Sequence, residues 1–286
     1  MKIQFENRVL SSFLLWFDHT LLKKGEAFTN YGSNFYPVDG LYYGYNAYGA
    51  PFKQFVTDSS IAGSTVLSGV YINGDFKTPG QSPFVDVNYE QGQVYLTTTP
   101  TGVISGNYSV KDFNIYLTAK AEQELLFENK IDIRPNTTQI MTGLASSVTT
   151  YPAVFIKNNG GNNNPYAFGG MDKTRIDLRA IVLADSQFNL DAVSSIMKDQ
   201  VSTEVPIIAD ENYPFNALGG FKSVSGYNYE QLTSTIGAGD RAFIAEIDVS
   251  RFSLGYMENL NNTNPDVFKA MIDFSLDVVR YPRQEL

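Results

Sequence analysis

Few side chains in this sequence could carry out nucleophilic or acid–base chemistry near neutral pH. In 286 residues there is no cysteine and a single histidine, His19. Cysteine and histidine supply most nucleophiles, general bases and soft-metal ligands in proteins. His19 follows Asp18, but consecutive helix residues point about 100° apart, so the two do not form a ready acid–base pair. We therefore expect His19 to lie on a helix surface or at an interface, and we expect no catalytic residue and no enzymatic activity.

Carboxylates are the other groups that could form a site. Oxygen ligands suit hard cations, and the acidic residues with suggestive spacing are Asp172, Asp177, Asp185, Asp210 and Glu211. No segment has the spacing of an EF-hand loop, and scattered carboxylates are normally solvated. We therefore expect no metal and no cofactor. A pair of carboxylates would also suffice for a glycosidase, and the sequence leaves that alternative open.

The composition favours assembly over catalysis. Apolar residues make up 43% of the chain, aromatic residues 14% and charged residues only 18%. Soluble monomers rarely expose large apolar patches, so we expect a homo-oligomer in which neighbouring subunits cover part of the surface. The formal net charge of −9 repels phosphate, so we expect no specific nucleic acid binding.

The absence of cysteine fits a cytosolic or virion protein and excludes a disulfide framework. The apolar N-terminal segment is interrupted by Glu6, Arg8 and Asp18 and lacks a small-residue cleavage site, so it does not fit a signal peptide. No stretch approaches the roughly 20 consecutive apolar residues of a membrane span. We expect no membrane partner.

Residues 3–24 have the pattern of a helix with an unusually broad apolar face. Lys23 and Lys24 suit the negative C-terminal end of such a helix, and Gly25 can cap it. A helix this apolar is expected to contact more than one surface, one of which belongs to a neighbouring subunit. The candidate interface residues of this helix are Phe13, Trp16 and Phe17.

The middle of the chain has a β pattern. Residues 31–48 are rich in Tyr and Gly and are predicted to form loop and short strands. Residues 50–134 contain short alternating runs between Gly, Pro, Asn and Asp clusters, which is typical of an antiparallel sandwich or barrel. Asn73-Gly74 tolerates the positive φ angles of a tight hairpin.

The last third of the chain is mixed. Residues 157–170 concentrate Asn and Gly and are predicted to be an exposed loop. A strand over 174–185 is followed by a helix over 186–200, with Ser186 as N-cap. Residues 240–254 and 268–282 alternate like long antiparallel strands with one wetted face.

These patterns predict an α+β fold in which the N-terminal helix and an antiparallel sheet form the body. Residues 1–45 and 140–286 form this discontinuous body, and residues 46–139 form an inserted, all-β, sandwich-like domain. Two sequential domains would give the same local patterns, and that alternative stays open.

A cluster of tyrosines could contact either a sugar or a protein. Aromatic faces stack on sugar rings, and they equally pack in cores and interfaces. We favour interface contact, because tryptophan, the largest stacking platform, occurs only once and lies in the predicted helix. The candidate interface residues of this cluster are Tyr42, Tyr43 and Tyr45.

Two segments resemble virion structural proteins of tailed bacteriophages with contractile tails. One contains the phrases PFKQFV and GVYING within residues 45–96, and the other contains DLRAIVLADS within residues 164–200. The likeness covers about half of the chain and includes no catalytic signature, so no functional residue is carried over. It implies a place in the neck or tail-completion region, at the head–tail connection.

The resemblance and the composition together predict a structural subunit of a phage virion that forms a homomeric ring. Its partners would be further copies of itself and adjacent ring proteins, and it would be assembled into the virion in the host cytoplasm. DNA passes through the lumen of such a ring, and an acidic wall would repel it. The alternative is a carbohydrate-binding or carbohydrate-active β-rich protein used in adsorption to the host.

Overall fold

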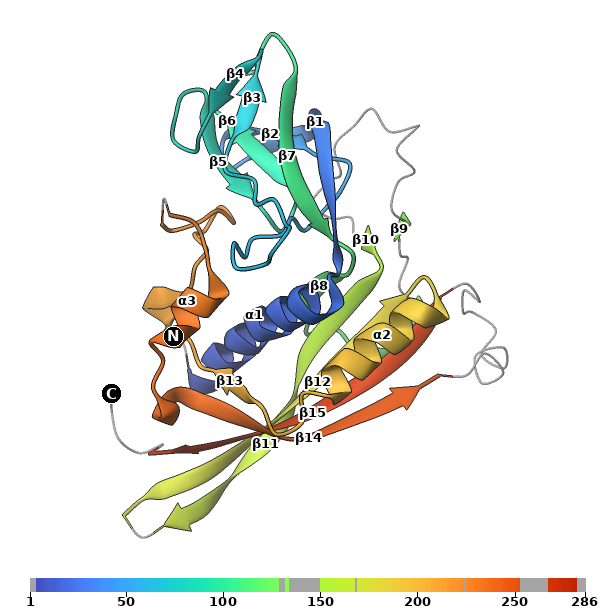
Figure 1. Ribbon diagram of the computed structural model, residues 1–286, viewed down its shortest axis with the longest axis vertical. Helices are drawn as coiled ribbons and strands as arrows, with labels where there is room; N and C mark the ends of the chain where they lie inside the picture. Colours follow the sequence, from blue (N-terminus) through green and yellow to red (C-terminus); the bar gives the residue numbers. More distant parts are fainter. Residues whose placement is uncertain are drawn as a thin grey trace.

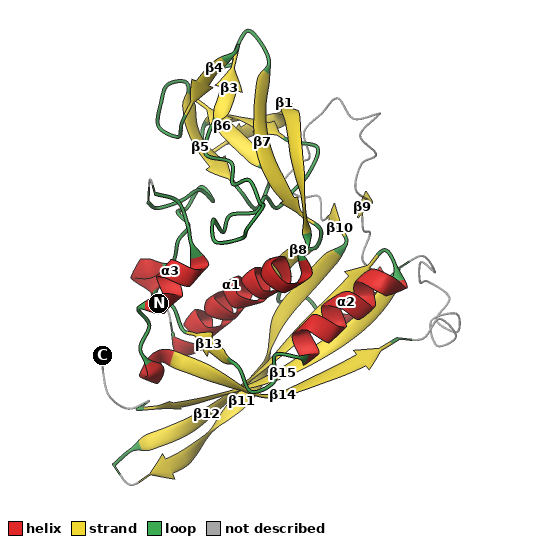
Figure 2. Ribbon diagram, viewed as in Figure 1, coloured by secondary structure: helices red, strands yellow, loops and turns green. Residues whose placement is uncertain are grey.

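The computed structural model describes residues 4–128, 132–133, 150–167, 169–223, 225–252 and 267–281. Strands make up 46% of the chain, so the protein is mostly β, with an N-terminal helix and few other helices. Two large curled sheets lie at opposite ends of the molecule, and helices lie between them (Figures 1 and 2).

The first sheet has seven strands in the order β4-β3-β7-β1-β2-β6-β5. It curls around a core that includes Phe35, Phe55 and Tyr108. The long strand β1 holds this sheet together, because its first half pairs with β7 and its second half pairs with β2. The bounds are β1 Phe28–Tyr42, β2 Tyr45–Gly49, β3 Val70–Ile72, β4 Asp75–Lys77, β5 Phe84–Asn88, β6 Gln93–Leu96 and β7 Ile104–Lys111.

The second sheet has six strands in the order β13-β14-β15-β12-β11-β8. All neighbours are antiparallel except β8 and β11, which are parallel. The predicted strands near the C-terminus are confirmed here as β14 and β15. The bounds are β8 Asn114–Leu117, β11 Ala153–Ala167, β12 Met171–Ala184, β13 Glu204–Pro206, β14 Arg241–Arg251 and β15 Phe268–Arg280.

Two helices pack on one face of the six-stranded sheet, α1 (Phe5–Gly25) and α2 (Gln187–Lys198). Both were predicted. The amide of Asn189 donates to Ser186 Oγ at 3.2 Å, which confirms the predicted N-cap of α2. The remaining short elements are α3 Tyr229–Ser234, a π-helix at Glu124–Glu128, 3₁₀ turns at Asp210–Asn212 and Ala238–Asp240, and the paired two-residue strands β9 Asp132–Ile133 and β10 Thr150–Tyr151.

Every residue of α1 from Leu15 to Leu22 is buried. On one side, Phe13 and Phe17 both pack edge to face against Phe274 of β15. On the other side, Leu22 packs with Val56 and Ile61, which belong to the connection between β2 and β3. The helix is therefore packed between the six-stranded sheet and the seven-stranded region of its own chain.

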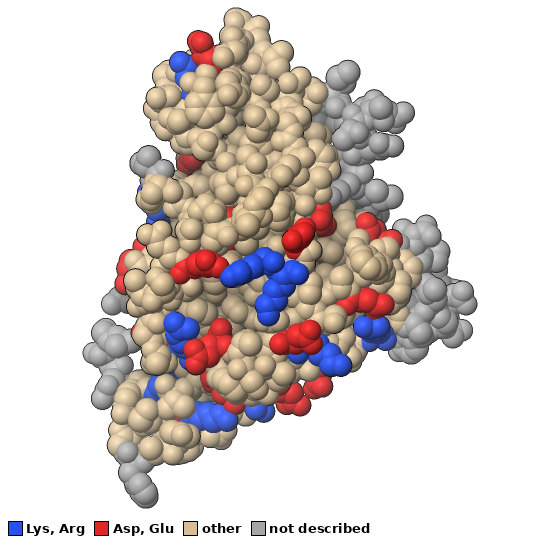
Figure 3. Space-filling view, viewed as in Figure 1, with Lys and Arg blue, Asp and Glu red and all other residues tan. Residues whose placement is uncertain are grey.

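The opposite face of the six-stranded sheet carries ion pairs. Lys173 and Arg175 of β12 both reach Asp277 of β15, at 2.8 and 3.2 Å. Arg179 binds Asp273 at 2.6 Å. Figure 3 shows acidic and basic side chains interspersed over the lower half of the molecule, whereas the end formed by the seven-stranded sheet carries few charges. Residues 28–111 contain eight: Asp39, Lys53, Asp58, Asp75, Lys77, Asp86, Glu90 and Lys111.

Some local predictions hold and others were wrong. Asn73 and Gly74, with φ of 54° and 89°, form the expected hairpin turn between β3 and β4. Residues 31–48 were predicted as loop and short strands, and they lie in β1, a strand of 15 residues, and in the short strand β2, because cross-strand pairing overrides the turn tendency of the glycines. In the predicted loop at 157–170, residues 159–167 are exposed as expected, but they extend β11 along β12.

The predicted domain boundaries lie at 45/46 and 139/140. The chain passes from one sheet to the other at different positions. β1 begins at Phe28 and already belongs to the seven-stranded sheet, and β8 begins at Asn114 and belongs to the six-stranded sheet. The Tyr- and Gly-rich composition of β1 hid its pairing with β7, which is distant in the sequence. The division into folding units stays a prediction.

Replacing Trp16 by Ala should lower the free energy of unfolding by about 3 to 5 kcal/mol, because a buried aromatic side chain is removed from a packed core. Trp16 is 6% exposed and contacts Phe13 and Phe274. Urea unfolding followed by circular dichroism measures the loss. The matched control is Phe188→Ala on α2, where the side chain is 81% exposed and the change should stay within about 0.5 kcal/mol. Equal effects of the two substitutions would contradict the packing.

Candidate functional site

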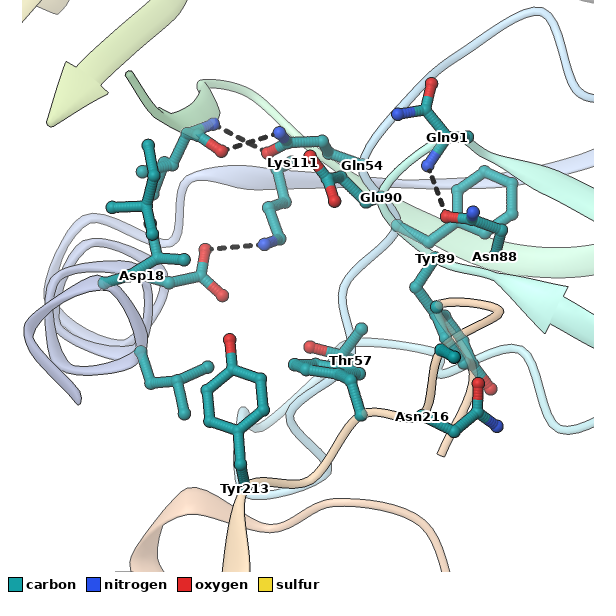
Figure 4. A pocket seen from close by; sticks show the side chains of 18 of the residues that line it. Asp18, Gln54, Thr57, Asn88, Tyr89, Glu90, Gln91, Lys111, Tyr213 and Asn216 are labelled. Atoms are coloured by element: carbon teal, nitrogen blue, oxygen red, sulfur yellow. Dashed lines mark hydrogen bonds and ion pairs between the residues drawn. The ribbon is translucent and has the colours of Figure 1, made fainter. Parts of the chain in front are cut away.

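A polar cavity of about 500 Å³ lies where α1, the seven-stranded sheet and the segment before α3 meet. Its walls come from several parts of the chain that are distant in sequence, between Leu14 and Gly219 (Figure 4). The lining includes apolar side chains such as Leu14, Leu15 and Phe55. The polar residues of the wall are Asp18, Tyr42, Gln54, Thr57, Asn88, Tyr89, Glu90, Gln91, Lys111, Tyr213 and Asn216.

A buried ion pair forms one side of the cavity. Asp18 lies in the fully buried part of α1 and is 6% exposed. Lys111, at the end of β7, places its Nζ atom 2.8 Å from Asp18 Oδ1 (Figure 4). Burial raises the pKa of Asp18 above its usual range, and Lys111 opposes that shift. The ion pair therefore compensates the charge of a carboxylate that the burial of α1 would otherwise leave unpaired inside the protein.

Gln54 fixes the cavity wall next to this ion pair. Its Nε2 donates to the carbonyl of Ile115 at 2.7 Å, and its Oε1 accepts from the amide of Ile115 at 2.6 Å. The amide of Lys111 also donates to the Gln54 carbonyl at 3.1 Å. These bonds attach the seven-stranded region to β8 of the other sheet, as the dashed lines in Figure 4 show.

Hydroxyl groups and a further carboxylate face the cavity. The Tyr213 hydroxyl points into it in the direction of Asp18, and Glu90 lies on the opposite wall (Figure 4). Burial, with the nearby charges of Glu90 and Asp18, raises the pKa of Tyr213 to about 12, so the phenol keeps its proton. Within the described residues, neither this hydroxyl nor that of Thr57 has a hydrogen-bond partner. The cavity can therefore donate to and accept from a hydroxylated ligand.

The single histidine lies beside this cavity in a second polar cluster. His19 Nδ1 is 2.6 Å from Asp58 Oδ2, and its ring stacks on Tyr229 with centroids 4.3 Å apart. Asp58 Oδ1 accepts from the amides of Ser60 and Tyr229, each at 2.9 Å, and from the Ser60 hydroxyl at 2.7 Å. The cluster joins α1, the β2–β3 connection and α3.

This arrangement is structural rather than that of an activated serine. The Ser60 hydroxyl donates to Asp58 and not to the histidine. Burial alone would raise the pKa of Asp58, but the hydrogen bonds from His19, the Tyr229 amide and Ser60 outweigh burial and hold the pKa below its usual range. The prediction of a surface or interface histidine was wrong, since His19 is 8% exposed. Its partner lies 39 residues away, and the sequence carries no signal for that pairing.

The candidate interface residues have two different surroundings. Phe13, Trp16 and Phe17 are buried in the core of the single chain, at 0, 6 and 0% exposure. The broad apolar face of α1 is thus covered by the chain itself. In the tyrosine cluster, Tyr43 is 72% exposed at the turn between β1 and β2, and Tyr45 is half-buried. Tyr42 lines the cavity and stacks on Tyr95 at 4.8 Å.

The scattered carboxylates do not come together. Asp177 accepts from Ser275 and Asp185 accepts from Asn189, at 2.8 and 2.7 Å. Asp172 is buried in β12, while Asp210 and Glu211 are exposed in a 3₁₀ turn. In the part of the chain that the structure describes, no group of three or more His, Asp or Glu residues could hold a metal ion.

Comparison of the sequence with known proteins finds no matching family and no matching curated protein. Among the helices of the described residues, none has the length and apolar character needed to cross a bilayer.

Replacing Lys111 by Met should destabilise the protein by about 3 to 5 kcal/mol near neutral pH, because Asp18 is left buried without its partner. The folded-state pKa of Asp18 is already raised. Its protonated form therefore favours folding below the ordinary carboxyl pKa, and this contribution is lost as the pH rises through the folded-state value. Without Lys111 that pKa rises further, so the destabilisation should shrink as the pH falls toward about 4.

Urea unfolding at a series of pH values measures this dependence. The control is the double variant Asp18→Asn/Lys111→Met, which has no buried charge at this place and should lose less stability at neutral pH than Lys111→Met alone. A loss that is the same at every pH would mean that Lys111 acts through packing and not through the charge of Asp18.

Proposed function

We propose that the chain is a structural subunit of a tailed-phage virion that assembles into a homomeric ring in the neck or tail-completion region. The observation that carries the proposal is a pair of open strand edges at opposite sides of the six-stranded sheet. β13 pairs with β14 only at Arg241–Phe243, and β8 pairs with β11 only at Ala153–Ile156. Beyond these short strands, no described strand covers residues 246–251 of β14 or residues 157–167 of β11.

Open edges of this kind support self-assembly. An uncovered strand edge presents a row of backbone donors and acceptors that can pair with another chain. Two different edges on one subunit suit a head-to-tail contact, which closes into a ring when the rotation between copies allows it. The net charge of −9 suits a lumen through which DNA moves without binding.

The proposal includes a structural and not an enzymatic role. The Asp18–Lys111 and His19–Asp58 pairs hold α1 in place, and the Ser60 hydroxyl beside the second pair donates to Asp58 and not to the histidine. We further propose that the body is an α+β unit built on the six-stranded sheet, and that the seven-stranded region is a sandwich-like insertion. In the virion, the subunit would contact adjacent ring proteins through its loops.

Native mass spectrometry of the purified protein should give one closed oligomer of several subunits, and negative-stain images should show rings. Mass spectrometry of purified particles of the phage that encodes the chain should also detect it. A protein that stays monomeric at every concentration and is absent from particles would end this proposal.

The second candidate function is carbohydrate binding, and the polar cavity is the specific observation that favours it. Its wall combines aromatic faces with amides, hydroxyls and carboxylates, which is the mixture that hydroxylated ligands require. A cavity of about 500 Å³ is within the usual size range of small-molecule sites.

Screening the protein on a glycan array, followed by calorimetry with any sugar that binds, tests this candidate. Tyr213→Phe removes one hydroxyl from the cavity and should weaken binding about tenfold, in line with a lost hydrogen bond. Tyr43→Phe removes an exposed hydroxyl outside the cavity and should leave binding unchanged. Absence of binding across the array, or equal effects of the two variants, would remove the cavity as a sugar site.

A further inference from the structure

The two open edges run in opposite directions. β11 is antiparallel to β12, β12 to β15, and β15 to β14, so β11 and β14 point opposite ways within one sheet. A second copy rotated about an axis roughly along the strands would place its β14 beside β11 of the first copy. That contact would be antiparallel, and it would continue the alternation of the sheet.

The backbone groups available on β11 follow from Pro165. Proline cannot donate to a ladder, and within sheets it lies where its nitrogen faces away from the neighbouring strand. Pro165 pairs in register with Asp172 of β12, so its nitrogen faces the open side. Asn163 lies two residues earlier with no register shift between them, so its amide faces the open side as well. Its side chain is exposed.

The backbone groups available on β14 follow from its bonds to β15. The amide of Phe252, directly after β14, donates to the carbonyl of Lys269. Since bonding direction alternates along an antiparallel strand, Ser250 and Asp248 face β15, whereas Val249 and Arg251 face outward. Both edges therefore present outward-facing backbone amides and carbonyls at every second residue, as an antiparallel ladder between them requires.

The side chains beside the two edges differ in charge. Glu246 and Asp248 are exposed along β14, and the charge of Arg251 at the end of this edge is paired with Asp191 at 2.7 Å. Lys173 and Arg175 are partly exposed on β12, one strand in from the open edge of β11. Contact between the two edges would bring the acidic pair of one copy near the basic pair of the next, which favours this contact over like-edge pairing.

We propose that the β11 edge at residues 157–167 pairs antiparallel with the β14 edge at residues 246–251 of the next copy. The inference rests on the proposed ring and names its subunit contact. In each copy the β14 edge lies level with Asp177–Val182 of β12, whereas the β11 edge lies level with Met171–Arg179. Neighbouring copies are therefore staggered along the strands, and a closed ring has strands tilted relative to its axis.

Cysteine cross-linking tests this pairing directly, because the natural chain contains no cysteine. Asn162→Cys and Ser250→Cys are combined in one chain and oxidised. The two positions are separated by two strands in their own subunit, roughly 14 Å, which is too far for an internal disulfide. Pairing between copies should therefore give a ladder of covalent multimers on a denaturing gel.

Three controls accompany this variant. Asn162→Cys alone can form at most covalent dimers. Asn162→Cys with Thr101→Cys places the second thiol at an exposed position of the seven-stranded region and should give no ladder. Asn162→Cys with Asp248→Cys tests a register shifted by two residues. Comparing its cross-linking with that of the first variant shows which of the two positions lies nearer to residue 162 of the next copy.

A backbone variant gives an independent readout. Asn163→Pro removes one outward amide without touching the ladder to β12, and it should raise the concentration needed for half-assembly about tenfold. Asn163→Ala keeps the amide and should assemble like the natural chain. Circular dichroism checks that both variants are folded.

The outcomes separate the contact from the ring itself. A ladder together with weakened assembly of Asn163→Pro supports the pairing. Assembly of the natural chain without a ladder in either register, or with no effect of Asn163→Pro, overturns this contact and leaves the ring proposal standing. A natural chain that is monomeric at every concentration overturns both.

Discussion

The burial of α1 on its whole circumference is the constraint on which the rest of the structure depends. From Leu15 to Leu22 no side chain of this helix is free to face water, although the stretch contains Asp18 and His19. Burying such groups without partners is costly, so the chain must bring Lys111 and Asp58 to them. Those partners belong to the seven-stranded region, and the same two contacts therefore attach that region to the helix.

The cavity is a product of the same constraint. Polar groups line the wall around Asp18 because a buried carboxylate needs polar partners, whereas the other side of the helix packs against aliphatic and aromatic side chains. One side of α1 thus has a dense aromatic core centred on Phe274, and the other has a hollow with hydroxyl and amide walls. The two sides of this helix therefore differ, since one is densely packed and the other borders a cavity.

The sequence was sufficient where structure is local. Helical spacing predicted α1 and α2, Ser186 predicted an N-cap, Asn73-Gly74 predicted a hairpin, and alternation predicted β14 and β15. The sequence was insufficient where the structure of a segment depends on pairing with a segment that is distant along the chain. β1 has the glycines of a loop, yet β7 covers its first half along eight registered pairs.

The candidate site belongs to the second kind. Tyr42 was identified as a functional candidate for its ring, but its position in the cavity depends on segments near Asp18, Lys111 and Tyr213. The partner of His19 likewise lies far along the chain, where no spacing rule connects it to the helix. A sequence pattern reports the period of one element, and it carries no information about which element lies opposite.

The two points at which the chain passes between the sheets lie next to each other. The amide of Asp112, directly after β7, donates to the carbonyl of Ala27, directly before β1, at 2.8 Å. The two ends of the segment from Phe28 to Lys111 are thus held together by a hydrogen bond between the residues that flank it. A segment closed in this way can change in length and composition without redirecting the chain on either side, provided that it still supplies partners for Asp18 and His19. The six-stranded sheet and its two helices could accordingly be retained while the part that projects from them changes from one relative to another.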